Sequence, residues 1–161
     1  MRALSSVLCL GLMLAALPAA AQQVAFGGLR ADTRGPVEIV SDTLSVDQET
    51  GLAVFSGNVR AKQGEMRMSS AELTVEYMGE DRSKIHFLRA AGDVILVSPT
   101  EQAQSDAAVY DVTTGQMVMT GNVLLTQGGS VMAGTQLDVD LKTGTGQMQG
   151  RVRTILQPGG N

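Results

Sequence analysis

Apolar and polar residues alternate along most of the chain that follows residue 36. In one such stretch, Val59 and Ala61 alternate with Arg60 and Lys62. A period of two residues is typical of β-strands with one buried face, whereas a helix buries every third or fourth residue. No helical period is present after residue 21. The pattern therefore predicts an all-β fold.

The alternating pattern is also repeated. Residues 41–77 align without a gap on residues 105–141, and 14 of the 37 aligned positions are identical. Unrelated segments of this length would share about two, so the chain contains an internal repeat. A shorter unit is marked by a Gly followed two residues later by Val, at spacings of 35, 29 and 29. These steps begin at Gly57, Gly92, Gly121 and Gly150.

Two kinds of turn recur within each unit. Residues 47–51, 111–115 and 140–144 share the pattern Asp-x-x-Thr-Gly. Gly at the last position supplies the positive φ that closes a hairpin turn with a bulge. Gln63-Gly64 and Gln127-Gly128 mark the second turn, and Pro99-Thr100 takes the equivalent place in the middle unit. Each unit is therefore predicted to be two long antiparallel strands.

The spacing of apolar residues predicts that these strands are bent. Aligned apolar pairs lie five residues apart, although one face of a straight strand requires even spacing. The pairs are Ile39 with Leu44, Met68 with Leu73, Ala103 with Ala108, and Met132 with Leu137. A bulge or corner midway would return both residues to one side, and on the partner strand it would fall at the Gly57-Asn58 type of step. We therefore predict bent antiparallel strands forming a two-sheet β-jellyroll, an open trough with exposed edges at both ends.

The predicted inner wall of the trough is the candidate binding site. It consists of Val37, Ile39, Leu44, Val46, Phe55, Val59, Met68, Leu73, Val75, Val94, Leu96, Tyr110, Met119, Val123, Leu125, Met132, Leu137, Val139 and Met148. Seven methionines follow residue 21, and aromatic residues make up only 3% of the sequence. Such a wall is adaptable and suits flexible apolar ligands. The alternative is an exported structural or adhesive β-solenoid whose apolar side chains only pack on one another.

The ends of the chain predict export. A basic start, a short apolar run and an Ala-x-Ala site indicate a signal peptide at residues 1–21. Residues 22–35 are expected to be a flexible leader in which Gly28 meets no steric constraint, residues 36–157 the domain, and 158–161 a short tail. The sole cysteine, Cys9, lies in the signal peptide. The remaining chain has 11 basic and 16 acidic residues, and a net charge of −5 argues against nucleic acid as a partner.

Catalytic and metal-binding groupings are not apparent. His86 is the only histidine, and Ser, Asp and His do not form a nucleophilic arrangement. The Asp-x-x-Thr-Gly turns lack the acidic density of calcium-binding repeats. We therefore expect neither an enzyme, nor a cofactor, nor a metal site. The basic residues between Arg60 and Arg89 are expected to form a solvated face, with phosphate contact as the alternative.

The strand edges at both ends are predicted to mediate assembly. An unpaired edge seeks a partner, so strand addition would join copies head to tail. The expected edge residues are Thr33, Val37 and Ile39 at one end, and Val152, Thr154 and Leu156 at the other.

Several segments together resemble a known family. Pro36 to Asp42, Phe55 to Val59, Gln63-Gly64 and Ala71 to Val75, preceded by a signal peptide, are similar to the LptA/OstA-like family of lipopolysaccharide-transport proteins. The resemblance runs from about Thr33 to Leu156. It implies a periplasmic jellyroll that carries the acyl chains of lipopolysaccharide between the inner and outer membranes. It also implies an LptC-type partner at the N-terminal edge and an LptD-type partner at the C-terminal edge.

Overall fold

The computed structural model describes residues 24–25, 27–79 and 82–157, so the expected signal peptide and tail lie outside the described residues. Its elements are β1 (Val24–Ala25), the 3-10 helix η1 (Gly27–Leu29), β2 (Glu38–Val40), β3 (Thr43–Val46), β4 (Ala53–Gln63), β5 (Met66–Met78), β6 (Lys84–Val97), β7 (Glu101–Asp111), β8 (Gln116–Gln127), β9 (Ser130–Asp140), β10 (Thr145–Gln149) and β11 (Arg153–Ile155). Among the described residues, no helix has the length and apolar character needed to cross a membrane.

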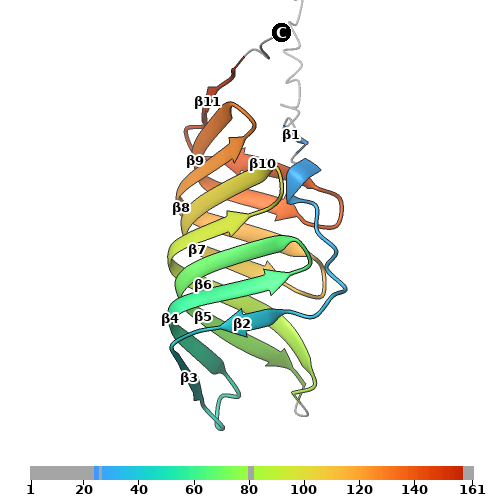
Figure 1. Ribbon diagram of the computed structural model, residues 1–161, viewed down its shortest axis with the longest axis vertical. Helices are drawn as coiled ribbons and strands as arrows, with labels where there is room; N and C mark the ends of the chain where they lie inside the picture. The colour runs from blue at the N-terminus through green and yellow to red at the C-terminus, as the bar shows by residue number, and fades with distance from the viewer. Residues whose placement is uncertain (1–23, 26, 80–81, 158–161) are drawn as a thin grey trace, which may run out of the picture.

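All strands belong to one antiparallel sheet, which confirms the predicted all-β class. Strands β4 to β9 lie in sequence order, each paired with the next. At one end β2 and β3 both pair with β4, and at the other end β10 and β11 both pair with β9. Figure 1 shows the resulting stack, with β3 near the bottom and β11 near the top. The sheet does not close on itself, so both ends remain open.

The predicted corners are present as β-bulges. Between Ser56 and Val59 the pairing of β4 with β5 shifts, so that Gly57 and Asn58 lie opposite the single residue Ala71. Gly57 has a φ of 80° and Asn58 a φ of 48°. Positive φ values in succession turn the strand sharply, and Gly and Asn tolerate this region better than other residues do. Equivalent pairs of positive φ occur at Gly92-Asp93, Gly121-Asn122 and Gly150-Arg151.

Side chains stabilise two of these corners in the same way. Asn58 Nδ2 donates to Asp42 Oδ2 at 2.7 Å, and Asn122 Nδ2 donates to Asp106 Oδ2 at 2.8 Å. Asp42 and Asp106 occupy the same position of the repeat, 64 residues apart. The repeated sequence therefore specifies a repeated corner.

The predicted turns are confirmed as well. Gly51, Gly115 and Gly144 have φ values of 74°, 81° and 70°, and each donates its N–H to the carbonyl of the Asp four residues earlier. In the first turn, Asp47 Oδ1 also accepts the N–H groups of Glu49 and Thr50 at 2.8 and 3.1 Å. The carboxylate thus satisfies donors that the turn leaves without a partner.

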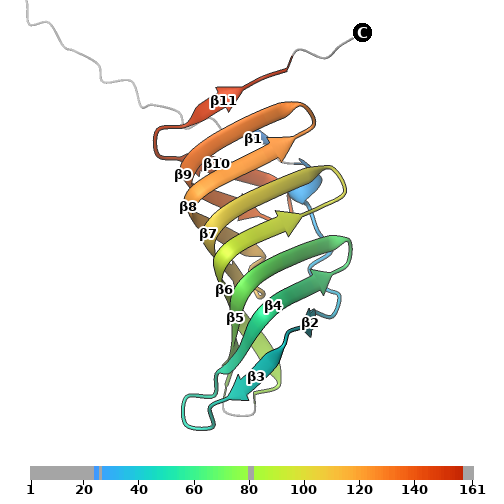
Figure 2. The same cartoon turned by 60° about the vertical axis from the view of Figure 1, so that its left-hand side comes forward.

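The corners divide the sheet into two facing halves. We call the half that contains β2 and β11 the β2 half, and the one that contains β3 and β10 the β3 half. The predicted two sheets are therefore one sheet folded along a line of bulges, and the apolar core lies between its halves. Figure 2 shows the folded shape from the side. The turns that connect the strands of each half lie on the side opposite the corners. We call the line where the turns of the two halves meet the seam.

Candidate functional site

Cross-strand register aligns the predicted inner wall into rows that run the length of the trough. One row in the β3 half consists of Leu44, Phe55, Leu73, Ala90, Ala108, Met119, Leu137 and Met148. A facing row in the β2 half consists of Ile39, Ala61, Met68, Leu96, Ala103, Leu125, Met132 and Thr154. Side chains in one row share a face of the sheet, so the wall is apolar along the trough, and Thr154 at the end of the second row is its one polar member.

Burial of the predicted wall residues changes from the middle of the stack to its ends. The buried ones are Val59, Leu73, Val75, Val94, Leu96, Tyr110, Met119, Val123, Leu125, Met132, Leu137 and Val139. Val37, Ile39, Phe55, Met68 and Met148 are half-buried and pack against this cluster. Leu44 and Val46 are 56% and 57% exposed, because they lie on the last strand of the β3 half. They share the rows of the wall but have a described neighbour strand on one side alone.

Five buried apolar residues were missed by sequence reasoning, among them Ala90, which pairs with Leu73 and Ala108. Ala53 and Met117 occupy the same position of the repeat, two residues before Phe55 and Met119, so stricter alternation would have found them. Leu88 pairs with Val75 and Tyr110, but the longer turn before β6 obscures its register. The fifth is Leu29, which belongs to no repeat.

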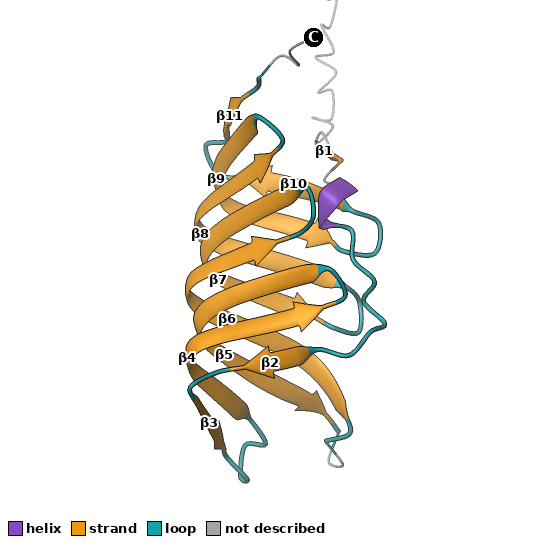
Figure 3. Cartoon of the chain, in the orientation of Figure 1, coloured by secondary structure: helices purple, strands orange, loops and turns teal. Residues whose placement is uncertain are grey.

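The expectation of a free leader is wrong for the part of it from residue 27 onward. Residues 27–37, which we call the strap, run along the seam, as the loop and short helix in Figure 3 show. Leu29 is fully buried in the core cluster. The Gly28 N–H donates to Glu101 Oε1 at 3.0 Å, and the Ala31 N–H donates to the Leu141 carbonyl at 2.9 Å. The strap therefore contacts both halves of the sheet.

Gly28 is constrained by this packing, contrary to the expectation for a leader glycine. A Cβ atom at Gly28 would overlap Oγ1 of Thr100 and would lie 2.7 Å from Cγ of Glu101. The absence of a side chain is what allows the backbone to approach the turn before β7. Composition alone could not reveal this contact, because the partners lie 73 residues apart.

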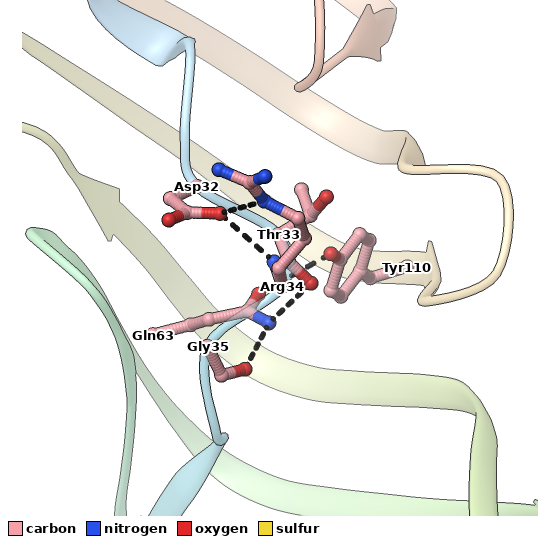
Figure 4. A network of polar contacts seen from close by, with 6 residues as sticks. All are labelled: Asp32, Thr33, Arg34, Gly35, Gln63 and Tyr110. Carbon is pink, nitrogen blue, oxygen red and sulfur yellow. Dashed lines mark hydrogen bonds and ion pairs between the residues drawn. The ribbon is translucent and has the colours of Figure 1, made fainter.

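A polar network joins the strap to both halves near the middle of the seam (Figure 4). Gln63 Nε2 donates to the carbonyls of Thr33 and Gly35 at 3.0 and 2.9 Å. Gln63 Oε1 accepts the hydroxyl of Tyr110 at 3.2 Å, which links the β2 half to the β3 half. Burial, together with the negative charge of Asp111, raises the pKa of Tyr110 to about 12. Tyr110 therefore remains a neutral hydrogen-bond donor at physiological pH.

Glu101 is a buried carboxylate at the same opening. Its side chain is 4% exposed, and Oε1 accepts hydrogen bonds from Gly28 N–H and from Gln127 Nε2, the latter at 2.6 Å. Oε2 is buried without a hydrogen-bond partner among the described residues. This polar group lies beneath the strap, at the edge of the apolar core cluster.

The space between the halves is small. A cavity of about 40 Å³ is lined chiefly by Val37, Met66, Met68, Leu88, Tyr110 and Met117. A volume of this size holds roughly two or three water molecules. This cavity alone is therefore too small to hold a long apolar ligand.

Of the two predicted assembly edges, the C-terminal one is exposed, whereas Thr33, Val37 and Ile39 at the N-terminal one are half-buried. Val152, Ile155 and Leu156 are 47%, 55% and 73% exposed at the C-terminal end. Thr154 lies in β11, which pairs with β9 through one edge. The C-terminal edge differs from the prediction in one respect, because β1 pairs with β10 through Val24 and Ala25. In the parts of the chain that the structure covers, no cluster of His, Cys, Asp and Glu is arranged to hold a metal ion.

Comparison with known proteins identifies the family. Residues 38–145, about two thirds of the chain, match the family described as "LptA/(LptD N-terminal domain) LPS transport protein". The chain belongs to this family. This finding confirms the resemblance recognised in the sequence.

Individual family relatives and a solved structure agree with this assignment. An uncharacterised protein of Rhizobium meliloti (strain 1021) is 30% identical over 141 residues, which cover 81% of this chain and 76% of the relative. The "Lipopolysaccharide export system protein LptA" of Haemophilus influenzae (strain ATCC 51907 / DSM 11121 / KW20 / Rd) is 26% identical, with 81% of each chain covered. The crystal structure of LptH from Pseudomonas aeruginosa, described as the LptA-homologous periplasmic component of a conserved lipopolysaccharide transport device, superposes with a TM-score of 0.71 at 17% identity. That superposition covers 80% of this chain and 99% of LptH, and it supports the predicted jellyroll fold.

Proposed function

We propose that this protein is a non-enzymatic periplasmic carrier that holds the acyl chains of lipopolysaccharide between the two halves of the folded sheet. The observation that supports this most directly is the apolar wall, whose rows continue through every strand from β3 to β10. A continuous apolar row offers a flexible chain similar contacts at each step along the trough. The export function named for the Haemophilus influenzae relative is consistent with this proposal.

The two open ends support a bridging role. We propose that the signal peptide directs the chain to the periplasm, that an LptC-type partner docks at the β2–β3 end, and that an LptD-type partner docks at the β10–β11 end. Exposed Leu44 and Val46 at one end, and Val152, Ile155 and Leu156 at the other, provide apolar surface beside unpaired strand edges. Such edges suit strand addition, and copies of the protein would join head to tail by the same contact.

Site-specific photo-crosslinking tests the binding site. A photoreactive amino acid at Met119, which is fully buried, should crosslink to lipopolysaccharide added to the purified mature chain. The same amino acid at Val118, which points to the other face, is the matched control and should not crosslink. Equal crosslinking at both positions, or none at Met119 while the protein remains folded, would contradict the proposed site.

Light scattering tests head-to-tail assembly. Thr154→Pro removes a backbone donor from β11. The variant should therefore stay monomeric at concentrations where the parent assembles into longer oligomers. Gln157→Pro, placed after β11, is the control and should assemble like the parent. A parent that stays monomeric throughout, or a Thr154→Pro variant that still lengthens, would exclude this edge contact.

The alternative function is an exported structural or adhesive solenoid with a closed core. The small cavity of about 40 Å³ favours it, since the interior side chains already pack closely on one another. One simple experiment distinguishes the two functions. A carrier purified from its native periplasm should release lipid on heat extraction, whereas a closed solenoid should release none.

A further inference from the structure

One long side of the trough is not closed by strand pairing. At the corners, strand pairing continues from one half to the other and is interrupted only at the bulges. At the seam, the halves end in separate sets of turns. A lipid whose acyl chains lie between the halves must keep its polar part in water, because burying unpaired polar groups is unfavourable. That polar part has to project through the seam.

The strap occupies this same opening. It contacts the β2 half through Glu101 and Gln63, and the β3 half through Leu141. In Figures 1 and 3 it runs alongside the stack from the region of β10 to β2. An amphiphile that projects through the seam and a strap in this position cannot share the space.

Leu29 fills part of the interior beneath the strap. It is 0% exposed and belongs to the same apolar cluster as Leu141 and the wall residue Leu125. Its isobutyl group therefore has the surroundings that the methylene groups of an acyl chain would need. Ala31 and Val37 add partly buried apolar contacts along the strap.

The strap is held by contacts that can be released. Two carbonyl groups of the strap accept hydrogen bonds from Gln63. One backbone N–H of the strap donates to Glu101, and another donates to Leu141. Closure also leaves Glu101 Oε2 buried with no partner among the described residues, which is unfavourable. Opening the strap would let water reach this oxygen. Hydration of the oxygen would offset part of the free energy that is lost when the hydrogen bonds of the strap break.

We infer that residues 27–37 form a lid, that Leu29 and an acyl chain compete for one site, and that lipid enters sideways through the seam when the strap leaves it. This inference rests on the proposed function. It adds the place where the lipid enters and the segment that controls loading. Because strap and lipid exclude each other, lipid can bind only when the strap has left the seam. Lipid loading and strap release are therefore coupled equilibria.

A reversible crosslink tests the lid directly. The Ala31 N–H donates to the Leu141 carbonyl and both side chains lie in or against the core cluster, so the pair Ala31→Cys and Leu141→Cys is placed to form a disulfide. The parent has no cysteine after Cys9, so no competing disulfide can form in the mature chain. The oxidised double variant should load lipopolysaccharide at least about tenfold more slowly than the same protein after reduction. Each single variant is the control and should be insensitive to the reductant.

A second variant loosens the lid without a crosslink. Leu29→Ala removes the buried anchor of the strap and should speed loading by about tenfold or more. Leu124→Ala is the matched control, because Leu124 lies on the outward face of β8 and should leave the loading rate unchanged. Hydrogen exchange provides an independent readout, in which lipid should increase exchange at the amides of Gly28 and Ala31.

The outcomes separate the lid from the carrier function. Equal loading by the oxidised and reduced double variants, with both folded, would show that lipid does not pass the strap, although the carrier function would stand. Equal rates for Leu29→Ala and Leu124→Ala, or unchanged exchange at Gly28 and Ala31, would overturn the lid in the same way. A parent that takes up no lipid under any condition would refute the carrier function, and the lid would fall with it.

Discussion

The two long sides of the trough are built on different principles. The corner side consists of one motif used four times, in which a Gly and the residue after it take positive φ at Gly57, Gly92, Gly121 and Gly150. The seam side is closed by contacts that each occur once, such as Gly28 with Glu101 and Gln63 with Tyr110. The corner is therefore a property of the backbone, whereas the seam depends on particular side chains far apart in the sequence.

This difference assigns different tasks to the two sides. Continuous strand pairing around the corners holds the two halves together, and a change there alters the shape of every neighbouring strand. The seam can open while the corners remain intact, because its contacts connect the halves without belonging to the sheet. We therefore expect variants of the corner to affect stability most, and variants of the seam to affect lipid loading most.

The largest effect is expected from the wall on which both sides depend. Leu125→Asp places a carboxylate where the side chain is fully buried, and should lower the free energy of unfolding by about 4 kcal/mol or more or prevent folding. Leu124→Asp, the adjacent residue on the outward face, should cost about 1 kcal/mol or less. Thermal melting of both variants checks this, and similar melting temperatures would mean that the two faces are wrongly assigned.

The next effect is expected at a corner. Gly92 has a φ of 79°, and a Cβ atom there would lie 2.8 Å from Cβ of Ala71, which cannot move without the backbone. Gly92→Ala should therefore lower the free energy of unfolding by about 2–3 kcal/mol, from positive φ and overlap together. Gly35→Ala is the control, because open space surrounds Gly35 and its φ is not positive. Denaturant titration measures both, and a Gly92→Ala variant as stable as the control would remove the argument for a rigid corner.

The same contrast explains what could be predicted from the sequence. The corners, the Asp-x-x-Thr-Gly turns and most of the wall recur at fixed offsets, so each copy supported the interpretation of the others. The strap could not be predicted in this way. Leu29 has no counterpart in the repeat, and its burial depends on strands that follow it by more than thirty residues. Gln63 looked like an ordinary turn residue, because nothing in its local sequence indicates Tyr110 or the carbonyls of Thr33 and Gly35 as partners.

A smaller effect is expected at the seam. Tyr110→Phe removes the hydroxyl that donates to Gln63 Oε1 and should lower the free energy of unfolding by about 1 kcal/mol. The pKa of Tyr110 is raised from 10.0 to about 12, so its neutral form is favoured in the folded state. The corresponding stabilisation is complete below pH 10 and is lost as the pH rises through 12. The stability difference between parent and Tyr110→Phe should therefore shrink over that range in alkaline melting experiments. A constant difference would indicate that the hydroxyl is not buried as described.

The smallest effect is expected at the turns of the β3 half. The backbone N–H of Thr50 is the main cause that lowers the pKa of Asp47, and that of Thr143 does the same for Asp140. At Asp111 burial is the largest single influence and acts in the opposite direction, but hydrogen bonds from Thr114 and Thr113 together outweigh it, so its pKa is also lowered. All three carboxylates are therefore more readily ionised in the folded state than in the unfolded state.

The sign of the pH dependence follows from this lowering. A carboxylate with a lowered pKa stabilises the folded state above the unfolded pKa of 3.8, and that contribution disappears as the pH falls through the lower, folded value. The melting temperature of the parent should thus contain a component that is constant from pH 7 to 5 and declines below about pH 4. Replacing Asp47, Asp111 and Asp140 together by Asn keeps the acceptor oxygen of each turn but removes its charge. The triple variant should lose less stability than the parent between pH 5 and 3. If the variant lost as much stability as the parent over this range, or more, the acid-sensitive carboxylates would lie elsewhere in the protein. The turns on the seam side would then be no more sensitive to pH than the corners.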